Sequence, residues 1–205
     1  MNTAKVDGLE VVTDGKRGPV VLMLHGWPDT RVLWDAQVAA LRDRFRCVRF
    51  TLPGFEPGSA RRATSLEEML TLFDKVVDLV SPDRPVVFLL HDWGCFFGYQ
   101  YAMLRPDRIE RVIGSRHHRV AGVNYPYDIA WTGSHGSYRD VRSVELACPL
   151  LFIYGRRKPF MFHSPTWEAG VAAQAGCEVV AMDTGHWVMR EQPAKVNDAI
   201  LRWLP

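Results

Sequence analysis

Residues 89–95 read Leu-Leu-His-Asp-Trp-Gly-Cys, so that an aspartate, Asp92, closely follows a run of apolar residues. The apolar run 86–90 is typical of a buried strand, and the segment 96–104 beyond the aspartate is typical of a helix. Asp92 therefore stands in a sharp strand-to-helix turn, where Gly94 permits a close backbone approach. A carboxylate at such a turn is either a helix N-cap or a reactive group.

Similar apolar runs recur along the chain and predict the other strands of a sheet. They lie at residues 20–24, 47–52, 111–113, 150–154 and 178–182. Short, continuous apolar runs suit strands that are covered on both faces.

Helical patterns lie between several of these strands, at residues 30–43, 65–80 and 192–204. Ser65 and Glu68 have the spacing of a capping box at the start of the second helix. The first helix is expected to place an apolar face on the core, made of Val32, Leu33, Ala36, Ala39 and Ala40. This alternation predicts an α/β fold, a single domain over residues 1–205 with a mostly parallel twisted sheet and helices on both faces.

Residues 115–138 break the alternation. The segment is rich in Gly, His, Tyr and Asn and has no sustained period, so that a long irregular connection is expected there.

Composition excludes several classes of protein. A net charge of +2 argues against a nucleic-acid or acidic-membrane partner. The four cysteines are far apart and form no CxxC pair, which favours reduced thiols and a cytoplasmic location. No secretory signal and no membrane span is expected from the sequence.

In a parallel sheet, ligands bind where the strands end. The residues that follow the predicted strands include His25-Gly26-Trp27-Pro28, Asp92-Trp93 and Gly185-His186-Trp187. A carboxylate and a histidine are thus expected at one edge of the sheet.

These motifs, HGWP, HDWG and GHW, occur in the order in which the α/β-hydrolase family carries them. The resemblance covers most of the chain and is strongest to the branch of epoxide hydrolases and haloalkane dehalogenases, which use an aspartate on the nucleophile elbow. In this chain Leu90 stands where the common G-x-S-x-G elbow has its first glycine.

The resemblance implies an epoxide hydrolase that forms an aspartyl ester and needs neither cofactor nor metal. Asp92 would be the nucleophile, His186 the base that activates water, and Tyr138 a proton donor to the epoxide oxygen. A second donor tyrosine could be Tyr125 or Tyr127.

The oxyanion would be held by the backbone N–H groups of Trp27 and Trp93. Around Trp27, the HGWP loop adds His25, Gly26 and Pro28 to the expected oxyanion and substrate-binding residues. The substrate would be a small apolar epoxide or haloalkane. Adjacent histidines would point in opposite directions on a strand, so the pair His117-His118 does not predict a metal site.

Two features depart from the family pattern, and the first is the acid that supports the base. Lys158 stands in the G-x-x-D turn where that acid is usual. The carboxylates left as candidates are Asp128, Asp140, Glu145 and Asp183. An incomplete triad would chiefly slow ester hydrolysis, so that a covalent intermediate would accumulate.

The second departure is the cap, which relatives insert as a helical unit of several dozen residues. Residues 115–138 are too few for it, so that a capless enzyme with an open site is expected. A homodimer is one way to cover apolar surface that a cap would otherwise face.

Three functions remain open at this point. The first is an epoxide hydrolase, and the second is a haloalkane dehalogenase in which the indoles of Trp93 and Trp27 hold the halide. The third is a catalytically impaired binding protein on the same fold.

Overall fold

Eight strands form a single sheet in the order β1-β2-β4-β3-β5-β6-β7-β8. The computed structural model describes residues 1–56, 58, 63–115, 141–159, 161 and 163–205. The strands are β1 (Asn2–Val6), β2 (Leu9–Asp14), β3 (Val20–Leu24), β4 (Arg46–Arg49), β5 (Val86–Leu90), β6 (Ile109–Gly114), β7 (Leu150–Gly155) and β8 (Glu178–Met182). From β4 to β8 neighbouring strands pair in parallel, whereas β1 and β2 are antiparallel.

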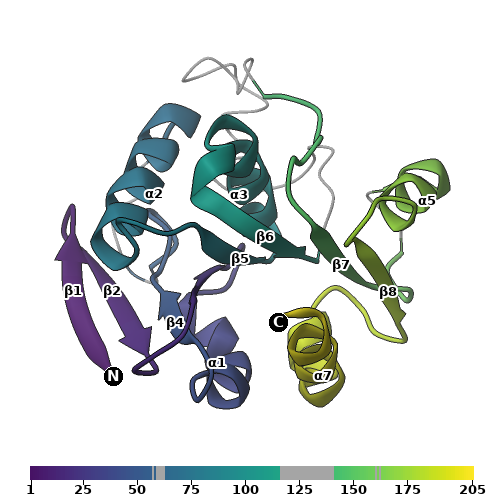
Figure 1. Ribbon diagram of the computed structural model, residues 1–205, viewed down its shortest axis with the longest axis horizontal. Coiled ribbons are helices and arrows are strands. Elements are labelled where there is room, and N and C mark those ends of the chain that lie inside the picture. Colours follow the sequence, from purple (N-terminus) through teal and green to yellow (C-terminus); the bar gives the residue numbers. More distant parts are fainter. Residues whose placement is uncertain (57, 59–62, 116–140, 160, 162) are drawn as a thin grey trace.

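Helices cover both faces of this sheet, as Figure 1 shows. One face carries α2 (Leu66–Val80), α3 (Trp93–Leu104) and α5 (Pro165–Ala172). The opposite face carries α1 (Asp35–Leu41), α6 (Val188–Glu191) and α7 (Pro193–Trp203). Two short 3-10 helices, η1 (Arg31–Trp34) and η2 (Pro106–Arg108), complete the described helices. The predicted α/β fold is therefore confirmed.

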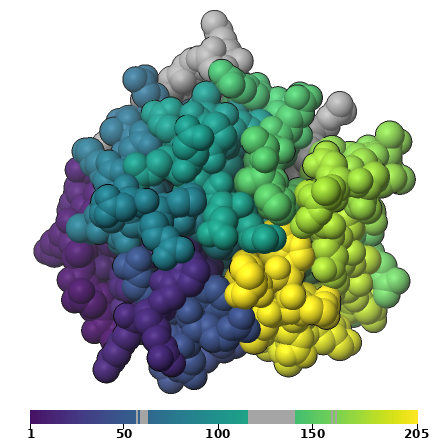
Figure 2. Space-filling model, viewed as in Figure 1, coloured from purple at the N-terminus to yellow at the C-terminus, as the bar shows by residue number. Residues whose placement is uncertain are grey.

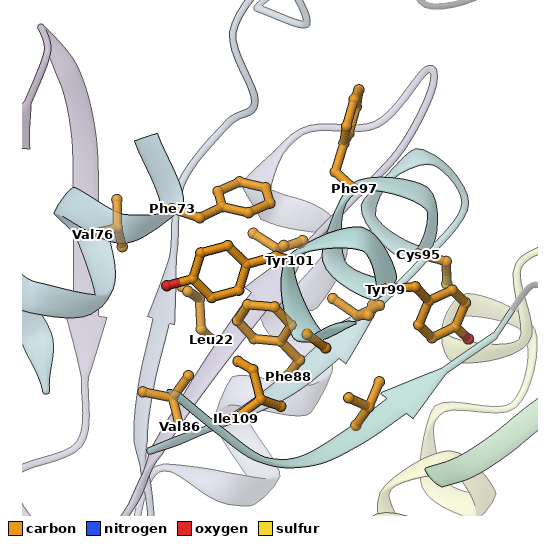
Figure 3. Close-up of a cluster of buried hydrophobic side chains, with 14 of the residues drawn as sticks. Leu22, Phe73, Val76, Val86, Phe88, Cys95, Phe97, Tyr99, Tyr101 and Ile109 are labelled. Atoms are coloured by element: carbon orange, nitrogen blue, oxygen red, sulfur yellow. The ribbon is translucent and has the colours of Figure 1, made fainter. Parts of the chain in front are cut away.

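The two faces bury separate apolar clusters. On the α2/α3 face, Phe73, Phe88 and Tyr101 meet edge to face or tilted, with ring centroids 5.6–6.4 Å apart (Figure 3). The Tyr101 hydroxyl donates to Asp74 Oδ1 of α2 at 2.9 Å. These contacts fix α3, whose first residue follows Asp92, against α2 and the sheet.

On the other face α7 packs beside α1, and Figure 2 shows the C-terminal helix in yellow next to the blue of α1. Gln37 Nε2 donates to Asn197 Oδ1 at 3.1 Å across this contact. The C-terminal helix of the chain thus packs against its first helix.

Three sequence predictions need correction. Strands β1 and β2 were missed, although Asp7-Gly8, with positive φ at both residues, forms the two-residue turn of a hairpin. The strand expected at 47–52 ends at Arg49.

The third correction concerns the buried face of the first helix. Val32 is 61% exposed, whereas Trp34, Val38 and Leu41 are buried. The buried residues of this segment, Leu33, Trp34, Gln37, Val38 and Leu41, recur at helical spacing, so that the core-facing stripe lies about one residue later in the sequence than predicted.

The capping box at Ser65 and Glu68 is confirmed by both of its hydrogen bonds, at 3.1 and 2.7 Å. Of the predicted connection 115–138, all but Ser115 lies outside the described residues.

Candidate active site

Asp92 occupies a strained turn between β5 and α3. Its φ of 51° and ψ of −117° lie outside the regions that L residues usually adopt, and such strain is concentrated at functional sites. Although Asp92 is the N-cap residue of α3, its side chain makes no capping hydrogen bond. The helix-cap alternative therefore does not account for the carboxylate.

Two glycines allow this turn to pack closely. A Cβ on Gly94 would lie 2.1 Å from the Leu24 carbonyl oxygen, and a Cβ on Gly26 would lie 2.4 Å from the Asp92 Cβ. No other residue fits at either position without movement of backbone or of the carboxylate.

Replacing Gly94 with alanine is expected to lower the free energy of unfolding by about 1–3 kcal/mol, because the added methyl overlaps backbone atoms. Gly170→Ala is the matched control. A Cβ there meets open space on α5, so that this variant should gain about 0.5–1 kcal/mol. Urea unfolding measures both, and equal stability of the two variants would contradict this packing.

The Asp92 carboxylate is only 2% exposed and lies between two groups. Its Oδ1 accepts a hydrogen bond from the Trp27 backbone N–H at 3.1 Å. Its Oδ2 lies 3.4 Å from His186 Nε2. The structure thus brings together three residues that the sequence assigns to one site.

His25 holds the loop that carries Trp27. Its side chain is fully buried, its Nε2 accepts from the Leu52 N–H at 2.9 Å, and its Nδ1 then donates to the Gly26 carbonyl at 2.9 Å. His25 therefore supports the loop that carries Trp27 from its buried side. Pro28 follows Trp27 through a cis peptide bond and is exposed.

Burial lowers the pKa of His25 from 6.5 to about 4. As the pH falls below 6.5, His25 binds a proton in the unfolded chain before it does so in the folded chain. The stability that comes from neutral His25 is therefore complete above pH 6.5 and is lost progressively toward pH 4.

We expect this loss to reach about 3 kcal/mol by pH 4, measured by urea unfolding across the interval. The variant His25→Asn should show a flatter dependence on pH. An equally steep dependence in that variant would assign the effect to other groups.

The two tryptophans have different surroundings. The Trp93 ring is fully buried and packs against Phe96 and Phe97, with centroids 5.2 and 6.0 Å apart, whereas Trp27 is 48% exposed. The backbone nitrogens of both residues lie near Asp92: the Trp27 N–H donates to Oδ1, and an added Cβ on Gly26 would meet the Trp93 nitrogen at 2.5 Å as well as the Asp92 side chain.

Two rings contact the His186 imidazole. His91 is tilted against it at a centroid distance of 4.6 Å, and Trp187 meets it edge to face at 4.9 Å. His91 Nδ1 is in turn 2.6 Å from the Ser115 hydroxyl. Nothing in the sequence pointed to this contact between His91 and His186.

The sequence left four carboxylates as candidates for an acid that supports His186. Asp183 is 71% exposed and lies 3.5 Å from Arg157 Nε, and Glu145 is exposed too. Asp128 and Asp140 lie outside the described residues, as do Tyr125, Tyr127, Tyr138 and His117-His118. Lys158 places its Nζ 6.0 Å from the centre of the Tyr154 ring.

A groove of about 1200 Å³ runs between α3, residues 141–147 and α5. Neither Asp92 nor His186 is among its described lining residues. In the described part of the chain, no helix is long and apolar enough to cross a membrane, and no three His, Cys, Asp or Glu side chains cluster as metal ligands.

Comparisons with known proteins identify the class. A family profile described as alpha/beta hydrolase fold matches residues 19–129, more than half of the sequence, and the chain belongs to this family. Over 98 aligned residues the chain is 40% identical to a protein named probable oxidoreductase EphD from Mycobacterium tuberculosis. The aligned part covers 46% of this chain and 16% of that protein.

An epoxide hydrolase from Caballeronia sordidicola is 32% identical over 106 residues, which are 50% of this chain and 32% of that protein. The chain therefore spans a third or less of these two relatives. In structure it resembles an epoxide hydrolase from Bacillus megaterium, with a TM-score of 0.71 at 15% identity over 98% of this chain and 99% of that one. It equally resembles a hydrolase from Pseudomonas aeruginosa, with a TM-score of 0.72 at 19% identity over 98% of both chains.

Proposed function

We propose that this chain is a hydrolase that opens an epoxide through an aspartyl ester and releases a vicinal diol. The observation that carries the proposal is the placement of Asp92. It sits on a positive-φ turn, with one oxygen on the Trp27 N–H and the other beside His186. A buried carboxylate with a backbone donor on one side and a histidine on the other has the parts that ester formation and hydrolysis need.

The geometry assigns different roles to the two carboxylate oxygens. Oδ1 is hydrogen-bonded to Trp27 N–H, so that Oδ2 is the oxygen that attacks the epoxide carbon. Attack breaks the C–O bond of the ring and gives an ester in which Oδ1 is the carbonyl oxygen. The alkoxide released from the ring takes a proton from a donor, and Tyr138 remains the proposed one.

Ester hydrolysis follows at the other side of Asp92. Neutral His186 removes a proton from water as the water attacks the Asp92 Cγ. Negative charge then develops on Oδ1, where the backbone N–H groups of Trp27 and Trp93 stabilise it. Collapse breaks the bond between Cγ and Oδ2, the departing oxygen takes the proton that His186 removed from water, and the diol leaves with the oxygen that came from Asp92.

Two observations favour an epoxide over a haloalkane. The curated relatives include proteins named epoxide hydrolase, from bacteria and animals. The HGWP motif at residues 25–28 is similar to that of epoxide hydrolases, whereas dehalogenases more often carry an Asn after the His-Gly pair. An ordinary serine esterase mechanism has no support, because Asp92 occupies the nucleophile position.

Incubation with styrene oxide and, separately, with a bromoalkane tests the proposal. We expect diol from the epoxide and little bromide from the haloalkane. Bromide without diol would favour the dehalogenase. Neither product, with no adduct in the intact mass, would favour a binding protein on this fold.

A further inference from the structure

The side chain of Asp29 links two loops of the candidate site. Asp29 lies two residues after Trp27, and its own N–H donates to the Gly26 carbonyl at 2.9 Å. Its Oδ2 accepts from the Trp187 indole Nε1–H at 2.8 Å, and its Oδ1 accepts from Arg190 at 3.3 Å. With a side chain only 9% exposed, this carboxylate is held by one donor from Trp187, the N-cap residue of α6, and by one from Arg190 within α6.

The partner of Asp29 touches the proposed base directly. The Trp187 ring meets the His186 ring edge to face, at 4.9 Å and 79°. At the end of α6, Glu191 Oε1 accepts from the Gly185 N–H at 2.9 Å. The backbone before His186 is therefore fixed by Glu191, and the ring beside His186 is fixed by Asp29.

We propose that Asp29 is a positioning residue. It keeps the His186 ring and the Trp27 N–H correctly placed at the two oxygens of the Asp92 carboxylate. One end of this link sets the loop that donates to Asp92 Oδ1, and the other end sets the indole that borders His186. Asp29 contacts no reacting atom. The kinetic part of this inference rests on the proposed function, whereas the structural part does not.

The link through Asp29 matters because ester hydrolysis needs the Trp27 N–H and the His186 ring in place at the same time. The oxyanion donor and the base must be correctly placed around the same carbonyl, and a displacement of about 1 Å can lower a rate by as much as about 100-fold. Ester formation needs only the Asp92 carboxylate and is less sensitive to the position of His186. Loss of Asp29 should therefore separate the two half-reactions.

An NMR experiment tests the structural part without a substrate. The ring-proton signals of His186, assigned with the variant His186→Gln, should shift in Asp29→Ala and in Trp187→Phe. They should stay in place in Asp29→Asn, since the amide oxygen still accepts the indole N–H. Asp78→Ala, which removes an exposed ion pair with Arg108, is the control. Unchanged His186 signals in Asp29→Ala would overturn the proposal.

Rapid mixing with styrene oxide, followed by mass spectrometry, tests the kinetic part. Asp29→Ala should slow ester hydrolysis about 10- to 100-fold and change ester formation less than about 3-fold, with recovery in Asp29→Asn. The double variant Asp29→Ala/Trp187→Phe should be no slower than the slower single variant. Additive losses would overturn the link through the indole. A wild-type protein without ester or diol would refute the proposed function instead, and the NMR result would then decide on Asp29 alone.

Discussion

Replacing Asp92 with asparagine is expected to abolish epoxide opening, with a loss of at least about 1,000-fold in diol formation. The amide lacks the negative charge and lone-pair reactivity of the carboxylate at Oδ2, so that no ester can form. Asparagine still accepts the Trp27 N–H bond and tolerates the φ of 51°, so that the elbow should keep its shape. Diol release from styrene oxide, followed by chromatography, measures the effect.

A matched control separates chemistry from folding. Asp74 is a carboxylate on α2 that accepts from Tyr101, away from Asp92, and Asp74→Asn should retain activity. Circular dichroism should give the same spectrum for both variants. Diol formation by Asp92→Asn at a rate close to wild type would remove the aspartate from the mechanism.

The second large effect is expected at His186. In His186→Gln the Asp92 carboxylate can still attack, but no base activates the water that must hydrolyse the ester. Hydrolysis should slow by about 100- to 10,000-fold, the usual contribution of a general base. After incubation with styrene oxide, the intact mass should then rise by the mass of one substrate molecule per chain.

His163→Gln provides the control, since His163 is a buried histidine whose Nε2 lies 3.4 Å from Oε2 of Glu168 in α5. This variant should release diol and accumulate no adduct. If His186→Gln also releases diol without an adduct, another group activates the water. An adduct in the wild-type protein would indicate that the base lacks the support of an acid, as Lys158 at the usual acid position implies.

Much of this site was predictable, because its residues follow strands in short motifs. The apolar runs fixed β3 and β5, and their carboxyl ends determine where Trp27 and Asp92 lie. GHW follows β8 in the same way and places His186 at this edge. Local patterns such as the capping box of Ser65 also hold, because they depend only on neighbours in sequence.

The rest depends on contacts between residues far apart in the chain. The bond between Asp29 and Trp187 joins residues 158 positions apart, and the ring contact of His91 with His186 also joins residues that are far apart in the sequence. No local pattern encodes such pairs. The buried face of α1 was missed for the same reason, because it includes the polar residue Gln37, which bonds to Met189 and Asn197 from the far end of the sequence.

A single turnover in water enriched in oxygen-18 tests the central claim most directly. With enzyme in excess over styrene oxide, the aspartyl route transfers an oxygen of Asp92 to the diol and puts the labelled oxygen into the protein. We predict unlabelled diol and a peptide containing Asp92 that is heavier by one label. Labelled diol and an unlabelled Asp92 peptide would show that water attacks the epoxide directly, and would contradict the aspartyl ester.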